Sequence, residues 1–268
     1  MIACARMYGS APSLSAAWRR LFEWVASRSG VAMEVVEHAY PASLDELWAR
    51  EDMGCVFMCG YPWALSARRP RLVAAPVPSL TRYGSRPIYF TDFLVHAGSR
   101  YRTLEETFGG RIAYSAESSH SGYNAARYHL LAYRTPERQA LYAETVGPLG
   151  APRRVLDAVA EGRADVGPVD SYLLDLWRRH LPEVTARVRV VATTKAAPIP
   201  PLVASPGTDP TVCDRLTATL VAAHLAPEIA ATLDGLLLTR FEPVAADVFE
   251  VLLERRRAAE QAGYPGLA

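Results

Sequence analysis

The chain has 268 residues, enough for one large domain or two of about 130 residues each with a sizeable core. Half of the residues are hydrophobic and 21% are charged, which is typical of a globular protein and excludes a disordered one. The 29 Lys and Arg residues nearly balance 28 Asp and Glu residues, so no overall field favours nucleic acid as a partner. No run of eighteen apolar residues predicts a membrane span.

The first third of the chain alternates between predicted strands and helices. Residues 2–7, 33–37 and 55–58 are predicted strands. An amphipathic helix is predicted from Ser13 to Gly30, and a short helix capped by Ser43 precedes the third strand. Such an order predicts right-handed crossovers and an open, mostly parallel α/β sheet.

Two aromatic side chains follow the third predicted strand. Ligands of open α/β sheets bind beyond the carboxyl ends of the strands, where Tyr61 and Trp63 are expected. These two residues are therefore candidate walls of a binding pocket. The alternative, that they only cover the core, remains equally open.

Two connectors divide the chain into lobes. After a strand over residues 71–77, the apolar run 88–95 is long for one strand and suits a passage between domains. The proline-rich run 198–203 suits a second passage. We therefore predict a discontinuous lobe 1 (residues 1–91 and 196–268) and an inserted lobe 2 (residues 92–195).

Lobe 2 contains a serine-rich turn between a predicted strand over residues 111–116 and a helix that begins near Ser121. The hydroxyls of Ser118, Ser119 and Ser121, together with free N–H groups at the helix start, favour an oxyanion. Gly122 would let a ligand approach the backbone closely. Alternatively, Ser121 only caps the helix.

The remaining elements complete both lobes. They are a short helix from Thr103, strands 143–146, 164–170 and 188–193, and helices 152–162, 171–179, 211–224, 229–233 and 244–262. Asp170 ends its strand and is a candidate ligand group or a cap of the next helix. The four cysteines and six histidines lack metal-ligand spacing, so no metal site is predicted. No catalytic or cofactor motif is present, so neither catalytic residues nor a cofactor are assigned.

Four blocks, taken in order, resemble the phosphonate-type (PhnD-like) substrate-binding proteins of ABC transporters. They are the long strand at Tyr89, the motif Ser-Ser-x-Ser-Gly-Tyr at residues 118–123, the helix-Gly-x-Ala-Asp-strand block at 155–166 followed by Asp170, and Pro-Ile-Pro-Pro at 198–201. The resemblance covers nearly the whole chain.

This resemblance implies a type II periplasmic-binding-protein fold, in which two α/β lobes joined by two hinge crossings capture a small oxyanion or zwitterion for uptake. The ligand's oxyanion would bind at Ser118, Ser119, His120 and Ser121, in a cleft between the lobes. Tyr61 and Tyr89 would contribute aromatic groups, and Asp170 would hold an amine or hydroxyl. The implied partner is an ABC transporter membrane permease, the location is periplasmic or cell-envelope, and the protein is expected to be a monomer.

The sequence departs from the family pattern in two ways. His120 replaces a small hydroxyl residue, and it either contacts the anion as a cation or points to solvent. No secretion signal is recognisable, which predicts a cytoplasmic location if that absence is native. The alternative function is a signal-free enzyme, a chorismate-dehydratase-like lyase in which Asp170, Glu117 or His120 acts as acid or base. A signal-free sensory subunit is a third reading.

Overall fold

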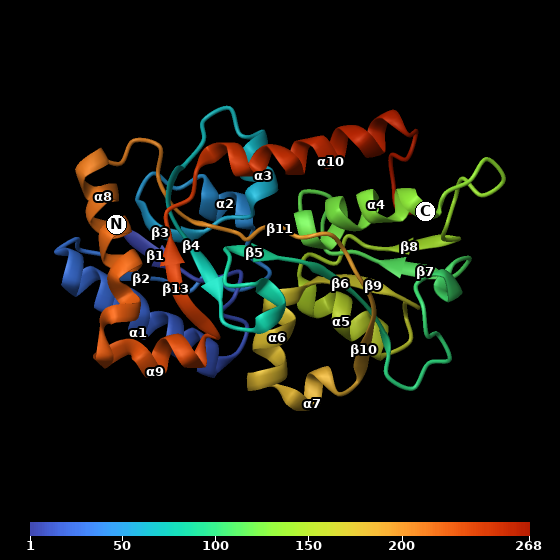
Figure 1. The fold of residues 1–268 in the computed structure, drawn as a ribbon, viewed down its shortest axis with the longest axis horizontal. Coiled ribbons are helices and arrows are strands. Elements are labelled where there is room, and N and C mark those ends of the chain that lie inside the picture. The colour runs from blue at the N-terminus through green and yellow to red at the C-terminus, as the bar shows by residue number, and fades with distance from the viewer. The chain divides into compact units, whose positions relative to one another are not determined.

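The computed structural model describes residues 1–268 and divides them into two compact units. Unit 1 comprises residues 1–88 and 198–249, and unit 2 comprises residues 89–197 and 250–268. The chain therefore passes between the units at three points (Figure 1). Two short strands, β5 (Ile88–Tyr89) and β11 (Ala197–Pro198), lie at the first two passages, close to where the sequence predicts crossings.

Unit 1 is built on a six-stranded sheet in the order β13-β4-β12-β3-β1-β2. Its strands are β1 (Ile2–Cys4), β2 (Glu34–Val35), β3 (Met53–Phe57), β4 (Arg71–Pro78), β12 (Leu202–Ala204) and β13 (Leu238–Glu242). The first four run in one direction, whereas β12 and β13 run in the opposite direction. The predicted parallel crossovers thus form the N-terminal part of the sheet, and returning C-terminal strands complete it.

The helices of unit 1 are α1 (Pro12–Ser29), α2 (Leu44–Trp48), α3 (Gly60–Leu65), α8 (Pro210–Ala222) and α9 (Pro227–Gly235). The apolar stripe of α1 is buried, and Trp18 packs edge-on against Phe57 at 4.9 Å between ring centroids. Gly30 ends this helix in the left-handed conformation, which glycine adopts without a Cβ penalty. Ser43 caps α2 as predicted, by accepting from the N–H of Asp45.

Unit 2 contains a sheet in the order β10-β6-β9 and a parallel pair, β7-β8. The strands are β6 (Thr91–His96), β7 (Arg111–Ala113), β8 (Glu144–Val146), β9 (Gly167–Asp170) and β10 (Val188–Thr193). A parallel bridge joins Ile112 of β7 to Val166, next to β9, and links the two sets of strands. The helices are α4 (Ala125–Leu130), α5 (Pro152–Ala160), α6 (Ser171–His180), α7 (Pro182–Thr185) and α10 (Glu250–Gln261).

The C-terminal helix groups differently from the predicted lobe boundaries. Residues 250–268 were expected in lobe 1, but α10 packs along α4, and both belong to unit 2 (Figure 1). Tyr264 and Leu267 lie in the hydrophobic core of unit 2. Burial of these apolar side chains after the last helix explains why the C-terminal segment joins that unit.

Other elements also differ from the sequence prediction. The run 88–95 is broken at Phe90 into β5 and β6, and the predicted helix over 244–262 is a 3₁₀ turn (Ala246–Phe249) followed by α10. The strands β12 and β13 and the helices α3 and α7 were not predicted, because they are short and have little periodicity. No single helix has the length and hydrophobicity of a membrane span; α8 and α9 reach those limits only as a pair, bent by 89°.

Candidate functional site

The serine turn, residues 118–122, joins β7 to α4 in unit 2. A π-helical turn, His120–Asn124, precedes α4, so the helix begins earlier than predicted. The cap is Ser119 and not Ser121: the Oγ of Ser119 accepts from the N–H of Gly122 at 3.0 Å. The capping alternative proposed for Ser121 is therefore wrong, and its hydroxyl is left for other partners.

The backbone of the turn is tied to the sheet by Thr91. The Oγ1 of Thr91 donates to the carbonyl of Ser121 at 3.2 Å, and Thr91 pairs with Asp170 in the β6–β9 register. This arrangement brings the turn and the end of β9 together, although about fifty residues separate them in sequence. Two hydroxyls of the turn, those of Ser118 and Ser121, make no hydrogen bond in the structure. Ser118 is exposed, whereas Ser121 is only 8% exposed.

Asp170 performs the capping role that its position allowed. One carboxylate oxygen accepts from the N–H of Leu173 at 2.9 Å, at the start of α6. The side chain is buried, and its negative charge adds to the effect of burial in raising the pKa of Tyr172. A carboxylate is thus fixed at the end of β9, beside the serine turn.

Gly122 is required by the packing of the turn itself. A Cβ at this position would lie 1.9 Å from the Oγ of Ser115 and 3.0 Å from the Oγ of Ser119. The absence of a side chain therefore lets the first turn of the helix close over the end of β7. The glycine was expected to let a ligand approach the backbone, whereas the structure shows a packing reason for it inside the turn.

His120 is buried inside unit 2 and does not point to solvent. It is 1% exposed; its Nδ1 lies 3.1 Å from Nδ2 of Asn124, and its Nε2 lies 3.4 Å from Nη1 of Arg255. Burial, with a smaller contribution from the positive charge of Arg255, lowers the pKa of His120 to about 3. The imidazole is therefore neutral at physiological pH in this structure, and the alternative that His120 points to solvent is wrong. A cationic His120 against a bound anion stays a prediction.

Tyr89 completes the cluster around His120. Its side chain is buried, and its ring lies 6.2 Å from the imidazole, at an angle of 51°. Tyr89, the serine turn and Asp170, three of the sequence-predicted components, thus occur in one region of unit 2.

Four residues around the serine turn were not predicted from the sequence: Thr91, Ser115, Asn124 and Arg255. Asn124 follows His120 by four residues on one helix face, a signal that was available in the sequence. Its Nδ2 donates to the carbonyl of Leu252, and its buried Oδ1 has no partner. Arg255 is 135 residues from His120, and nothing in the local sequence indicates their contact.

Tyr61 and Trp63 lie on α3 in unit 1. Both are buried; the Nε1 of Trp63 donates to the carbonyl of Pro70 at 2.8 Å, and its ring packs against Phe249 at 5.1 Å. These are the contacts of a core residue. The role of Tyr61 and Trp63 in ligand binding stays a prediction.

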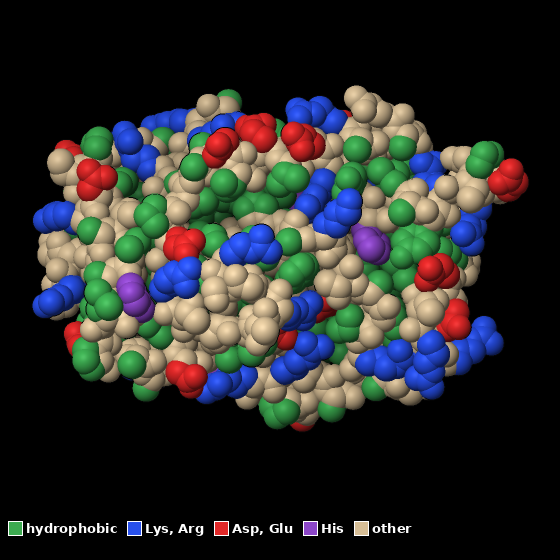
Figure 2. Space-filling view, in the orientation of Figure 1, with side chains coloured by type: hydrophobic (Ala, Val, Ile, Leu, Met, Phe, Trp, Pro, Cys, Tyr) green, Lys and Arg blue, Asp and Glu red, His purple; other side chains and the backbone are tan.

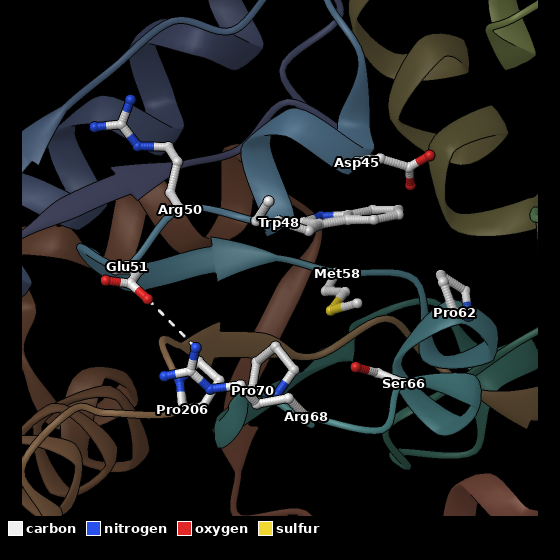
Figure 3. A pocket seen from close by; sticks show the side chains of 11 residues that line it. Asp45, Trp48, Arg50, Glu51, Met58, Pro62, Ser66, Arg68, Pro70 and Pro206 are labelled. Carbon is white, nitrogen blue, oxygen red and sulfur yellow. Dashed lines mark hydrogen bonds and ion pairs between the residues drawn. The ribbon is translucent and has the colours of Figure 1, made fainter.

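A cavity of about 370 Å³ opens elsewhere in unit 1, next to Trp48 and Met58 (Figure 3). Its charged rim includes the exposed ion pair between Arg68 and Glu51, at 3.3 Å. No buried, uncompensated charge faces this cavity, so we do not assign the anion site to it. The structure also has no group of three or more His, Cys, Asp or Glu side chains that could hold a metal, and none of its four buried cysteines forms a disulfide.

The sequence profile of one family, described as "ABC transporter, phosphonate, periplasmic substrate-binding protein", matches residues 7–249. The chain belongs to this family. The function of this binding protein is accordingly solute binding for an ABC transporter, with a membrane permease as its partner, and not enzymatic turnover. Membership of a periplasmic family fits a periplasmic or cell-envelope location. No curated protein matches the sequence.

Solved structures support the two-lobe fold of this binding protein. A binding protein component of an ABC phosphonate transporter from Pseudomonas aeruginosa is 14% identical, with a TM-score of 0.79 over 98% of this chain and 86% of that one. PhnD1 from Prochlorococcus marinus in complex with methylphosphonate is 12% identical, with a TM-score of 0.77 over 97% of each chain. A Xanthomonas citri protein bound to ATP is 21% identical, with a TM-score of 0.64 over 98% and 97%.

The packing of Gly122 against Ser115 can be tested by a compensating pair. Gly122→Ala should lower the free energy of unfolding by about 1–3 kcal/mol, because the new methyl group overlaps the Oγ of Ser115. Adding Ser115→Ala removes that oxygen and should restore part of the loss. Urea denaturation measures both variants; equal stability of the single and double variants would contradict the packing explanation.

The neutral state of His120 predicts a pH dependence of stability. The folded-state pKa of about 3 lies below the ordinary value of 6.5, so the unfolded chain binds the extra proton between these values. The free energy of unfolding should be highest above pH 6.5 and fall by at most about 1.4 kcal/mol per pH unit toward pH 3 on account of this group.

The comparison is with His120→Gln, measured by urea denaturation at a series of pH values. In this variant the free energy of unfolding should fall less steeply between pH 6.5 and pH 3 than in wild type. Because burial also lowers the pKa of His129, a smaller slope of the same sign remains in that variant. Substitution of the exposed His224 by Gln serves as the control. Parallel curves for wild type and His120→Gln would show that His120 is not buried as a neutral group.

Proposed function

We propose that the protein binds a small phosphonate-like anion at the serine turn, for delivery to the permease. The observation that carries this proposal is the pair of unused hydroxyls, on Ser118 and Ser121, beside a helix start whose cap is already supplied by Ser119. Hydroxyls and N–H groups at the start of a helical segment stabilise an oxyanion. The family description and the methylphosphonate held by a structural neighbour support the same ligand class.

The turn suits binding without chemistry. His120 is neutral and enclosed by Asn124 and Arg255, so at physiological pH it has no proton to lose as a cationic acid. Asp170 is held by the N–H of Leu173. These groups are fixed in place by the fold, which reduces the entropy lost when a ligand binds.

Asp170 gives the site a means to recognise a second ligand group. Its buried carboxylate lies at the end of β9, which the β6–β9 register and Thr91 bring beside the turn. An amine on the ligand would offset this negative charge, while the anionic group binds the serine hydroxyls. We therefore propose a zwitterionic aminoalkylphosphonate, or a simple alkylphosphonate, as the ligand. The predicted position of this ligand in a cleft between lobes stays a prediction.

The serine hydroxyls should contribute directly to affinity. Ser118→Ala and Ser121→Ala should each weaken methylphosphonate binding by roughly 1–3 kcal/mol, the range for a hydrogen bond to a charged group. Isothermal titration calorimetry measures the change. Ser27→Ala, an exposed serine on α1, is the matched control and should bind normally. Normal binding by both turn variants would place the anion elsewhere.

Replacement of Asp170 by Asn separates the two ligand types. Asn is as good an N-cap as Asp, so Asp170→Asn should keep the start of α6 while removing the charge. The variant should bind an aminoalkylphosphonate at least about tenfold more weakly, because a hydrogen bond between two charged groups is lost. Its affinity for methylphosphonate should be unchanged or higher. An equal loss for both ligands in calorimetry would argue that Asp170 only supports the fold.

A further inference from the structure

Arg255 is a buried cation without an acidic partner. It lies on α10 and is 7% exposed. Its Nη2 donates to the carbonyl of Ala196 at 2.5 Å, its Nη1 lies 3.4 Å from Nε2 of His120, and its guanidinium carbon lies 5.7 Å from the ring centre of Tyr128. A carbonyl, a neutral imidazole and a ring stabilise the group, but none of them cancels its charge.

Other arginines of unit 2 show the contrast. Arg111, Arg153 and Arg178 contact aspartates at 3.2, 3.1 and 2.7 Å. Arg127 is also buried without an ion pair, but it donates to the carbonyl of Pro265 in the C-terminal segment. Arg255 therefore differs from all of these in holding an uncompensated charge directly against a residue of the serine turn.

The cluster at this point offers more donors than acceptors. The Nδ2 of Asn124 donates to the carbonyl of Leu252, which fixes the orientation of the amide. The same Nδ2 faces one ring nitrogen of His120, and Arg255 faces the other. A neutral imidazole accepts at only one nitrogen, so one of these two contacts is not a good hydrogen bond. Burial of Arg255 also lowers its pKa, the direction expected for a cation that lacks a counter-ion. Negative charge nearby would relieve both effects.

We propose that Arg255 sets the charge preference of the anion site, so that the protein selects dianionic tetrahedral groups over monoanionic ones. This inference rests on the proposed binding of an anion at the serine turn. At an assumed separation of about 6 Å from the guanidinium and an effective dielectric constant of about 20, a second negative charge would change affinity by about 100-fold. Screening by water reduces that value, and a preference of about 10- to 100-fold is expected.

The test uses ligands that differ in charge. Calorimetry of the full chain compares sulfate, a dianion, with methanesulfonate, a tetrahedral monoanion, and follows methylphosphonate below and above its second ionisation. Wild type should bind sulfate more tightly than methanesulfonate, and methylphosphonate more tightly as the dianion. Arg255→Gln should reduce both ratios about tenfold or more, whereas Arg255→Lys should keep most of each preference.

Arg257→Gln is the matched control, since this exposed arginine lies on the same helix and carries the same charge. Its ratios should equal those of wild type. If Arg255→Gln binds anions with the wild-type ratios, the inference is overturned while the proposed function stands. If wild type binds no tetrahedral anion, the proposed function itself fails. Circular dichroism shows whether Arg255→Gln folds. If it does not, wild type and Arg255→Lys decide the question. Equal wild-type affinity for dianion and monoanion overturns the inference, and a dianion preference kept by Arg255→Lys supports it.

Discussion

The burial of His120 as a neutral side chain is the constraint on which the site depends. A small hydroxyl residue at this position would leave space between the serine turn and α10, whereas an imidazole fills it and contacts both Asn124 and Arg255. Desolvation disfavours the charged form, so the ring remains neutral, and the only full positive charge within this cluster is that of Arg255. The C-terminal helix therefore supplies the charged neighbour of this neutral ring.

The position of α10 follows from hydrophobic burial further along the chain. Tyr264 and Leu267 lie in the core of unit 2, and the guanidiniums of Arg127 and Arg134 bind carbonyls of residues 262–265. These contacts hold the end of α10 against α4, so that Arg255 reaches the serine turn. The C-terminal segment thus has a role in the site, although no residue after Asp170 was predicted to belong to it.

Surface charge contributes little to the electrostatics of the buried cluster around His120 and Arg255. Basic and acidic side chains are dispersed over the visible face of the molecule (Figure 2), in keeping with the balanced composition. The electrostatics that matter are local and buried, where the effective dielectric constant is lower than in water and a single charge has a larger effect. Balanced surface charge is therefore compatible with the proposed anion site.

The sequence by itself determined the family, the α/β succession and the serine turn, because these depend on local periodicity, capping residues and short motifs. It also placed Asp170 correctly at a strand end that caps α6. The tertiary structure alone decided the neutral state of His120, the need for Gly122 and the contact between Arg255 and His120. Each of these depends on a neighbour that folding brings close. His120 is buried beside Arg255, and Gly122 packs against the Oγ of Ser115. Arg255 lies on a helix that begins 130 residues after His120. Local sequence patterns carry no information on such contacts, since desolvation and packing are properties of the assembled chain.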